Sequence, residues 1–265
     1  MTDEMIAQLG SVLDRLGAVA IAVSGGVDSM TLAWFAHRRS PERVTLYQAR
    51  SPAVPVAATE RVRDYAAKNA WRLEVIDARE FSDPSYRANP ADRCLYCKRN
   101  LYGAIAMRTE ARVASGTNLD DLDDYRPGLE AAQQFGVYHP YVEAGIGKAG
   151  VRALASHFGL RDLAQLPASP CLSSRIETGI RIETPDLDFI DQIETLLRAE
   201  LSPEIIRCRR RRDGIVIEFD QAALQRVQSE DSSGLRARLN ESCRARGFPE
   251  PRYEGYRRGS AFVLP

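Results

Sequence analysis

The chain has 265 residues, enough for one large domain or two smaller ones, and 44% of them are hydrophobic, as in proteins with a buried core. Its 36 basic and 36 acidic side chains balance, so no overall charge favours nucleic acid or a membrane surface as a partner. No apolar run is long enough to cross a bilayer, and the acidic residues 1–4 do not resemble a signal peptide. We therefore expect a cytoplasmic protein without a membrane partner, whose five cysteines are reduced thiols.

The first two-thirds of the chain predicts strands that alternate with helices. An apolar run at residues 18–23 ends in a glycine pair, as buried parallel strands often do, and helical spacing follows at 29–38. The alternation continues, with strands expected at 43–47, 71–76 and 112–116 and helices at 57–69, 101–110 and 150–158. This order predicts an α/β fold with a doubly wound parallel sheet, which binds ligands beyond the carboxyl ends of its strands.

The pattern changes near residue 180. An amphipathic helix is expected at 186–200, followed by a hairpin of strands 205–212 and 215–219 that turns at Asp213-Gly214. Helices at 221–228 and 233–246 and a last strand at 252–256 complete the chain. We predict a first domain at 1–180 and a smaller α+β domain at 181–265.

A glycine-rich segment joins the first expected strand to the helix after it and reads Ser24-Gly25-Gly26-Val27-Asp28-Ser29. Two glycines let the backbone bring its N–H groups close to an anion, and the helix start points its positive end at the same place. No Lys-Ser or Lys-Thr follows, so this is not a Walker A loop. The segment predicts a phosphate or pyrophosphate site, with a plain strand-to-helix turn as the alternative.

This segment resembles the Ser-Gly-Gly-x-Asp-Ser loop of the PP-loop ATP pyrophosphatase superfamily, whose members cleave ATP between its α and β phosphates. The resemblance implies that ATP and Mg2+ are cofactors and that Asp28 helps to hold the metal. It implies that the nucleotide contacts Ser24, Gly25, Gly26, Asp28, Ser29 and, at the next strand end, Gly116, Thr117 and Asn118. Lys148 and Arg152 resemble phosphate-contacting residues of these folds, with a solvated helix start as the alternative.

Three further segments narrow the resemblance: Asp124-Tyr125-Arg126-Pro127-Gly128-Leu129, Ala168-Ser169-Pro170-Cys171-Leu172-Ser173-Ser174-Arg175 and Gly255-Tyr256-Arg257-Arg258-Gly259. In this order they are similar to the LarE family, the ATP-dependent sulfur transferases of nickel-pincer cofactor synthesis, over almost the whole chain. The resemblance implies that ATP adenylates a carboxylate of pyridinium-3,5-biscarboxylic acid mononucleotide and that sulfur then displaces AMP. It also implies a homo-oligomer.

The resemblance assigns roles to individual residues. Asp28, Lys148 and Cys171 are expected to be catalytic. Asp124, Arg126, Ser174, Arg175, Arg207 and Arg209 are expected to bind the substrate. Alternation along a strand puts Arg207 and Arg209 on one face, and the guanidinium fork suits phosphate or carboxylate. A charged, solvated edge strand and an RNA-binding patch are the alternatives, although the balanced charge weighs against nucleic acid.

The cysteines predict the source of sulfur. Cys94 and Cys97 form a C-x-x-C pair expected just before a helix, and with Cys171 they could hold a [4Fe–4S] cluster with one open iron. Such a cluster would take sulfide from a sulfur donor. Zinc, with His139 as a fourth ligand, and a pair of inert buried thiols are the alternatives. Some LarE enzymes sacrifice a cysteine at the position of Pro170, so the chain resembles the cluster-bearing branch. Cys208 and Cys243 are expected to be structural.

Three other functions share parts of this pattern. Cluster-dependent tRNA thiolation uses a similar loop and three cysteines. An amide ligase similar to NAD synthetase shares the loop but leaves the C-x-x-C pair unexplained. A nucleotide-sensing module without catalysis would need only the loop.

Overall fold

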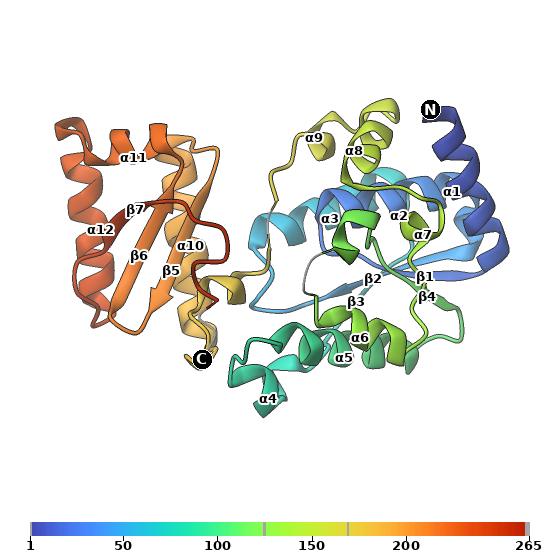
Figure 1. Cartoon of the computed structure of the whole chain (residues 1–265), viewed down its shortest axis with the longest axis horizontal. Coiled ribbons are helices and arrows are strands. Elements are labelled where there is room, and N and C mark those ends of the chain that lie inside the picture. Colours follow the sequence, from blue (N-terminus) through green and yellow to red (C-terminus); the bar gives the residue numbers. More distant parts are fainter. Residues whose placement is uncertain (1, 124–125, 169, 263–265) are drawn as a thin grey trace. The chain divides into compact units, whose positions relative to one another are not determined.

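The structure is a computed structural model that describes residues 2–123, 126–168 and 170–262. The chain forms two compact units: Met1–Tyr86 with Asp92–Ser169, and Arg87–Ala91 with Pro170–Pro265 (Figure 1). We expected the second domain to begin at residue 181. In the structure the second unit also contains residues 170–180 and the short segment Arg87–Ala91.

A four-stranded parallel sheet in the order β3-β2-β1-β4 forms the centre of the first unit. Its strands are β1 (Val19–Ala22), β2 (Val44–Ala49), β3 (Leu73–Ile76) and β4 (Arg112–Ala114). Ile21 of β1 pairs with Leu46 on one side and with Ala114 on the other. The predicted parallel α/β sheet is confirmed, because each strand overlaps a segment where the apolar pattern predicted one.

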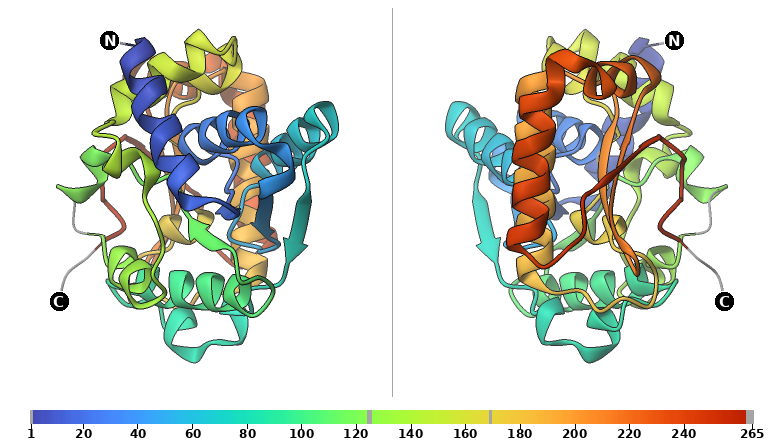
Figure 2. Two further views of the ribbon diagram at one scale, coloured as in Figure 1. Left: turned by 90° about the vertical axis from the view of Figure 1, so that its right-hand side faces the viewer. Right: turned by 90° about the vertical axis from the view of Figure 1, so that its left-hand side faces the viewer.

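Helices cover both faces of this sheet. In chain order they are α1 (Thr2–Leu16), α2 (Val27–Arg39), α3 (Val56–Asn69), α4 (Pro84–Arg87), α5 (Arg93–Ala106), α6 (Gly128–Gln134), α7 (Pro140–Glu143), α8 (Lys148–His157) and α9 (Arg161–Ala164), with 3-10 helices η1 (Pro41–Arg43), η2 (Glu80–Ser82) and η3 (Leu119–Leu122). One buried cluster contains side chains of α1, α2, α3 and α8, and another contains side chains of α5 and α6. Figures 1 and 2 show these two sets on opposite sides of the sheet.

Two helices differ from expectation. Helix α1 was not predicted, although its buried Leu9, Val12, Leu13 and Leu16 have helical spacing. Helix α5 begins at Arg93, eight positions before the expected start at 101. The C-x-x-C pair therefore lies inside a helix rather than before one. A spacing of three puts both thiols on one side of α5.

The second unit contains a three-stranded sheet in the order β5-β6-β7. Its elements are η4 (Leu172–Arg175), α10 (Thr184–Leu201), β5 (Ile206–Arg211), β6 (Gly214–Phe219), α11 (Gln221–Gln228), η5 (Glu230–Ser232), α12 (Ser233–Ala245) and β7 (Arg252–Gly255). Strands β5 and β6 are antiparallel, as the predicted hairpin requires, and β7 is parallel to β6. The right-hand view of Figure 2 shows α12 in front of this sheet.

Asn89 explains why residues 87–91 belong to the second unit. The side chain is completely buried, and its Nδ2 donates to the carbonyl oxygens of Glu177 at 2.9 Å and Ile180 at 3.0 Å. The backbone N–H of Gly179 in turn donates to the carbonyl of Asn89. These bonds tie a segment from the first half of the sequence to the loop that precedes α10.

None of the helices in the described part of the chain combines the length and apolar character that a membrane crossing requires.

Candidate functional site

The loop between β1 and α2 depends on glycine at position 25. Gly25 has a φ of 80°, in the left-handed region, and a Cβ atom there would lie 2.5 Å from the carbonyl oxygen of Ala58 in α3. Both the conformation and the contact exclude a larger side chain. The loop is therefore packed directly against the first turn of α3.

The same loop presents unpaired backbone donors. The N–H groups of Gly25 and Gly26 donate to none of the described residues. Gly26 is the N-cap of α2 and makes no side-chain capping bond, so the first N–H groups of the helix are also available. Unpaired N–H groups at a helix start form a binding site for an anion such as phosphate. The geometry is thus what a nucleotide loop requires.

Arg61 of α3 holds this loop from behind. Its Nη1 donates to the carbonyl oxygen of Gly25 at 2.9 Å. The C=O and N–H groups of a trans peptide point in opposite directions, so this bond turns the N–H of Gly26 away from Arg61. Arg61 forms no ion pair with any described carboxylate. Arg61 therefore orients the loop from the side opposite to the N–H of Gly26.

The two serines of the loop bond to each other. The backbone N–H of Ser24 donates to Ser29 Oγ at 3.1 Å, and the two hydroxyl oxygens lie 3.3 Å apart. Ser29 is buried and also donates to the carbonyl of Gly26. Ser29 therefore shapes the loop, whereas Ser24 is exposed and remains accessible.

The second predicted segment, after β4, lies against the first. A Cβ atom on Gly116 would lie 2.7 Å from the backbone nitrogen of Ser29. Asn118 is buried, and its Nδ2 donates to Asp28 Oδ1 at 3.2 Å. The structure thus brings together two segments that are almost ninety positions apart in the sequence. They meet at the carboxyl edge of the sheet, where we expected the ligand.

Asp28 is the centre of this site. Lys148 Nζ lies 2.5 Å from Asp28 Oδ2, and the two side chains are 34% and 25% exposed. Tyr141, which is completely buried, donates its hydroxyl to the carbonyl of Asp28, and burial raises its pKa well above the ordinary value. Asp28 is therefore fixed by three elements but can still be reached by solvent or a ligand.

Lys148 and Arg152 have different roles, although both lie on α8. Asp120 accepts a hydrogen bond from the backbone N–H of Lys148 at 3.0 Å and so caps the helix that carries it. Arg152 donates to the carbonyl oxygens of Ala164 and Leu166. Arg152 therefore ties down the segment after α9, which is neither of the two roles that the sequence suggested for it.

These residues fit ATP and Mg2+. The loop offers N–H donors for phosphate oxygens, and Lys148 beside Asp28 offers positive charge. The carboxylate of Asp28 is the kind of oxygen ligand that Mg2+ prefers, and magnesium usually keeps several waters and takes only one or two protein carboxylates.

Thr117 leads to a short chain of polar contacts. Ser115 Oγ lies 2.9 Å from Thr117 Oγ1 and 2.9 Å from His139 Nδ1. Burial lowers the pKa of His139, and the nearby charge of Lys98 lowers it further. His139 is therefore a neutral imidazole near pH 7 with one nitrogen engaged by Ser115.

The hexapeptide at 124–129 is described only in part. Asp124 and Tyr125 lie outside the described residues, so the substrate-binding role of Asp124 stays a prediction. Arg126 Nη2 forms an ion pair with Asp121 Oδ1 at 2.6 Å. Gly128 begins α6, and a Cβ atom there would lie 3.0 Å from Lys98 Cγ. The glycine of this motif is thus explained by packing against the helix that carries the C-x-x-C pair.

The five thiols differ in exposure. Cys171 is exposed, Cys94 and Cys97 are half-buried, and Cys208 and Cys243 are buried. Burial raises the pKa of Cys208 well above the ordinary value and that of Cys243 to about 11, which fits the expected structural roles of both. No three side chains of His, Cys, Asp or Glu group as metal ligands within residues 2–123, 126–168 and 170–262. Cys94 and Cys97 belong to the first unit and Cys171 to the second, so the cluster that they were expected to share, and the zinc alternative with His139, stay predictions.

The second unit holds Arg175 in its interior. Its Nε and Nη2 donate to the two carboxylate oxygens of Glu194 at 2.9 and 3.1 Å, and both side chains are buried. Nη1 donates to the carbonyl oxygens of Pro170 and Cys171 and to Ser174 Oγ. Every nitrogen of this guanidinium is therefore used within the protein. Arg175 shapes the loop that presents Cys171.

Two further arginines of β5 are also buried. Arg209 donates to Glu218 Oε2 at 3.0 Å and to the carbonyl of Ser174 at 3.0 Å. Arg207 lies with its guanidinium carbon 5.7 Å from the ring centre of Tyr256. Burial lowers the pKa of Arg207 to about 10, and the charge of Arg175 adds to this effect. The solvated edge strand considered from the sequence is wrong, since Arg207 and Arg209 are 9% and 4% exposed.

Three arginines and two glutamates are the buried charged side chains among the described residues of the second unit: Arg175, Arg207, Arg209, Glu194 and Glu218. Arg207 and Arg209 lie two positions apart on β5, as predicted, and the guanidinium fork suits a phosphate or carboxylate group.

Several of these residues were not found from the sequence. Glu194 had a signal, since it interrupts the apolar face of α10 next to Ile193. Glu218 likewise interrupts an apolar strand. Arg61 and Tyr141 had none, because nothing in their local sequence shows that they contact the β1–α2 loop.

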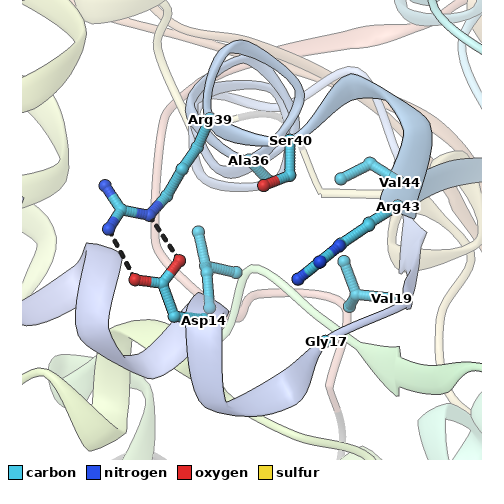
Figure 3. Close-up of a pocket in the computed structure, with 9 residues that line it drawn as sticks. Asp14, Gly17, Val19, Ala36, Arg39, Ser40, Arg43 and Val44 are labelled. Carbon is cyan, nitrogen blue, oxygen red and sulfur yellow. Dashed lines mark hydrogen bonds and ion pairs between the residues drawn. The ribbon is translucent and has the colours of Figure 1, made fainter.

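A surface pocket lies at the other edge of the first sheet (Figure 3). It is lined by Gly17, Val19, Ser40 and Val44, at the amino ends of β1 and β2, and Arg39 donates two hydrogen bonds to Asp14 beside it. Its volume of about 10 Å³ has room for one water molecule at most. This pocket is therefore separate from the β1–α2 loop and too small for a substrate.

No family model matches the chain. It is 28% identical to the pyridinium-3,5-bisthiocarboxylic acid mononucleotide synthase of Lactiplantibacillus plantarum, over 91% of this chain and 87% of the synthase. It is also 24% identical to a probable tRNA sulfurtransferase of Methanothermobacter thermautotrophicus, over 58% of this chain and 43% of that protein. The relatives with a named activity are thus sulfur-transfer enzymes or synthases. The names of these two relatives do not mention an iron–sulfur cluster, so the cluster stays a prediction.

An uncharacterized protein of Synechocystis, slr1717, is 32% identical over 241 residues, which is 88% of both chains. The chain therefore belongs to the same family as slr1717.

Proposed function

We propose that this protein is an ATP-dependent sulfurtransferase that replaces a carboxylate oxygen of pyridinium-3,5-biscarboxylic acid mononucleotide by sulfur, in nickel-pincer cofactor synthesis. The observation that carries the proposal is the meeting of the β1–α2 loop, with its unpaired N–H groups, and the Asp28–Lys148 pair at one edge of the sheet. The similarity to the bisthiocarboxylic acid mononucleotide synthase over 91% of the chain supports the choice of substrate.

ATP is proposed to bind with its phosphates on the N–H groups of Gly25 and Gly26. Lys148 supplies positive charge to the same phosphates, and Asp28 holds Lys148 in place until the nucleotide arrives. Bound Mg2+ supplies charge neutralisation for the departing pyrophosphate. These interactions stabilise the transition state, in which negative charge develops as the bond between the α and β phosphates breaks.

Adenylation solves a chemical problem for sulfur transfer. A carboxylate is a poor acyl donor because an oxide-like oxygen leaves badly. The substrate carboxylate attacks the α phosphorus, pyrophosphate leaves, and a mixed anhydride with AMP is formed. A sulfur nucleophile then attacks the acyl carbon and AMP departs with the original carboxylate oxygen. A second round at the other carboxylate gives the dithio product.

The second unit is proposed to bind the phosphate and carboxylate groups of the substrate. The position of Arg207 and Arg209 on one face of β5, with guanidinium groups that suit phosphate and carboxylate, supports this role. Ser174 and Arg175 are proposed to act differently from each other. The Ser174 hydroxyl can contact the substrate, whereas Arg175 positions the Cys171 loop from the interior.

Cys171 is the proposed catalytic thiol, and its exposure supports access by a substrate. We also propose that Cys94, Cys97 and Cys171 ligate a [4Fe–4S] cluster. An assay of iron and acid-labile sulfide on anaerobically purified protein tests this. Several irons per chain, lost in the Cys94→Ala variant, would support the cluster. Absence of iron after reconstitution would leave Cys171 as the direct sulfur carrier.

Transfer of sulfur to tRNA is the second candidate, because a probable tRNA sulfurtransferase is among the relatives. That match covers only 43% of the other protein. The balanced charge of the chain also offers no general attraction to a polyanion.

The test compares AMP and pyrophosphate release with the biscarboxylate mononucleotide and with tRNA. We expect the mononucleotide to stimulate release and tRNA to have no effect. Lys148→Met should reduce the stimulated rate at least tenfold, because it removes a positive charge that stabilises the transition state. Lys68→Met, which removes an exposed lysine of α3, is the control and should be unchanged. Stimulation by tRNA alone would favour the second candidate.

A further inference from the structure

Gln48 is a buried side chain without a hydrogen-bond partner. It is 1% exposed, and neither its Nε2 nor its Oε1 has a partner among the described residues. Buried amides in proteins are almost always hydrogen-bonded, because an unpaired one loses its bonds to water without gaining others in the protein. An unpaired buried amide therefore indicates a position where a ligand or a bound water supplies the missing hydrogen bonds.

The strand register places Gln48 beside the nucleotide loop. Tyr47 pairs with Ala22 of β1, and the N–H of Val23 donates to the carbonyl of Tyr47 at 2.9 Å. The next pair in this parallel register is Gln48 with Val23, the residue immediately before Ser24. Gln48 is therefore at the carboxyl end of β2, directly next to the strand that ends in the loop.

Alternation along β2 fixes the face of the sheet on which Gln48 lies. Leu46 belongs to the cluster with Val62 of α3, and Tyr47 belongs to the cluster with Tyr102 and Ile105 of α5. Side chains two positions apart share a face. Gln48 thus shares the face of Leu46, which α3 covers (Figure 1). The first turn of α3 also contacts Gly25 through Ala58.

We propose that Gln48 reads the nucleobase of ATP. Adjacent strands are about 4.8 Å apart, so a nucleotide with its phosphates on the β1–α2 loop can reach the end of β2. The edge of adenine offers one donor, the N6 amino group, beside an acceptor nitrogen, and a carboxamide matches this pair with its own acceptor and donor. Because Gln48 is 1% exposed, this contact requires the first turn of α3 to move away from the loop when the base binds. This inference rests on the proposed use of ATP and adds a specificity-determining residue to it.

The test is calorimetric titration of two ligands, ATP and inorganic tripolyphosphate, both with Mg2+. The Gln48→Leu variant removes the carboxamide and keeps an apolar side chain at a buried position. It should bind ATP about tenfold more weakly, as expected for the loss of one or two hydrogen bonds, and bind tripolyphosphate as the unsubstituted protein does. Its melting temperature should be equal or higher, because a buried unpaired amide is removed.

Thr31→Val is the matched control. Thr31 is also completely buried, and its hydroxyl has no partner in the described chain, but it lies inside α2. This variant should bind both ligands normally. The Gln48→Met variant repeats the experiment with a side chain of similar length, in case leucine packs poorly.

The outcomes separate the two proposals. Failure of the unsubstituted protein to bind ATP would overturn the proposed function together with this inference. Normal ATP affinity in the Gln48→Leu and Gln48→Met variants would overturn the role of Gln48 alone. An equal loss for ATP and tripolyphosphate would also overturn it, because the substitution would then disturb the loop rather than base recognition.

Discussion

Arg175 and Glu194 form a bidentate ion pair in the interior of the second unit, with side chains that are 0% and 1% exposed. Glu194 Oε1 also accepts from the backbone N–H of Cys208 at 3.0 Å, and Oε2 accepts from Arg198 at 2.6 Å. The pair thus links the Cys171 loop to α10 and to β5. We expected Arg175 to bind the substrate. In the structure it is buried and bonds to other residues of the second unit.

Removing one partner of this pair should destabilise the second unit strongly. Glu194→Gln keeps the shape but leaves Arg175 buried without a counter-charge, and such changes typically cost about 3–5 kcal/mol. Urea unfolding measures the effect. Glu200→Gln is the control. Glu200 lies on α10, as Glu194 does, and forms an exposed ion pair with Arg238, so its loss should cost less than about 1 kcal/mol. Equal, small effects would contradict the structural role of the pair.

The same pair predicts the response to acid. Burial alone would raise the pKa of Glu194, but the charge and hydrogen bonds of Arg175 hold it below its ordinary value of 4.5. A carboxyl group whose pKa is lower in the folded protein stabilises it above the ordinary value and loses this contribution as the pH falls below it. The free energy of unfolding should therefore fall below pH 4.5. In the Glu194→Gln variant this decline should be smaller, and an identical decline would contradict the prediction.

Gly25 should be irreplaceable for nucleotide binding. Gly25→Ala adds a Cβ atom that collides with the Ala58 carbonyl and also strains a positive φ, so the loop must move. We expect at least a tenfold loss of ATP affinity in a titration, the order of effect of losing a charge-assisted hydrogen bond.

Gly159→Ala is the matched control for this substitution. Gly159 has a similar φ of 77° but no atom within 4 Å of its Cβ position. It should therefore show only the strain of the backbone, about 1 kcal/mol of stability, with normal ATP affinity. A normal affinity in the Gly25→Ala variant would show that the loop does not bind the nucleotide.

The thiols should react in the order of their exposure. Cys171 is exposed, so a thiol reagent should label it first in folded protein that carries no cluster. Burial raises the pKa of Cys243 to about 11 and that of Cys208 well above its ordinary value, so both should resist labelling until the protein unfolds. Mass spectrometry of tryptic peptides measures the order. Early labelling of Cys208 would contradict the packing of β5 against the helices.

The periodicity of the sequence predicted most of the fold. The apolar runs at β1 and β2 and the Asp213-Gly214 turn have local signatures, and the structure has strands or a hairpin there. The start of α5 was placed too late because Arg93 and the C-x-x-C pair give no apolar periodicity. The segment Arg87–Ala91 could not be assigned to the second unit from sequence, because the hydrogen bonds of Asn89 are made with residues about ninety positions away.

The site was predictable in its parts but not in its contacts. The glycine loop and the segment after β4 were found, because both follow strands of a parallel sheet. Arg152 was grouped with Lys148 because both are basic residues of one helix, yet its guanidinium binds backbone carbonyls. Arg175 was assigned to the substrate because an arginine in a loop gives no sign that it will be buried. Such differences depend on tertiary contacts, which composition and spacing do not encode.

Transfer of isotopic oxygen tests the central claim most directly. The substrate carboxylates are labelled with oxygen-18, and the AMP formed with ATP, Mg2+ and a sulfur donor is analysed by mass spectrometry. If the carboxylate is adenylated and sulfur then displaces AMP, one labelled oxygen should appear in AMP for each sulfur that enters the product. Unlabelled AMP, or formation of ADP in place of AMP and pyrophosphate, would contradict the account.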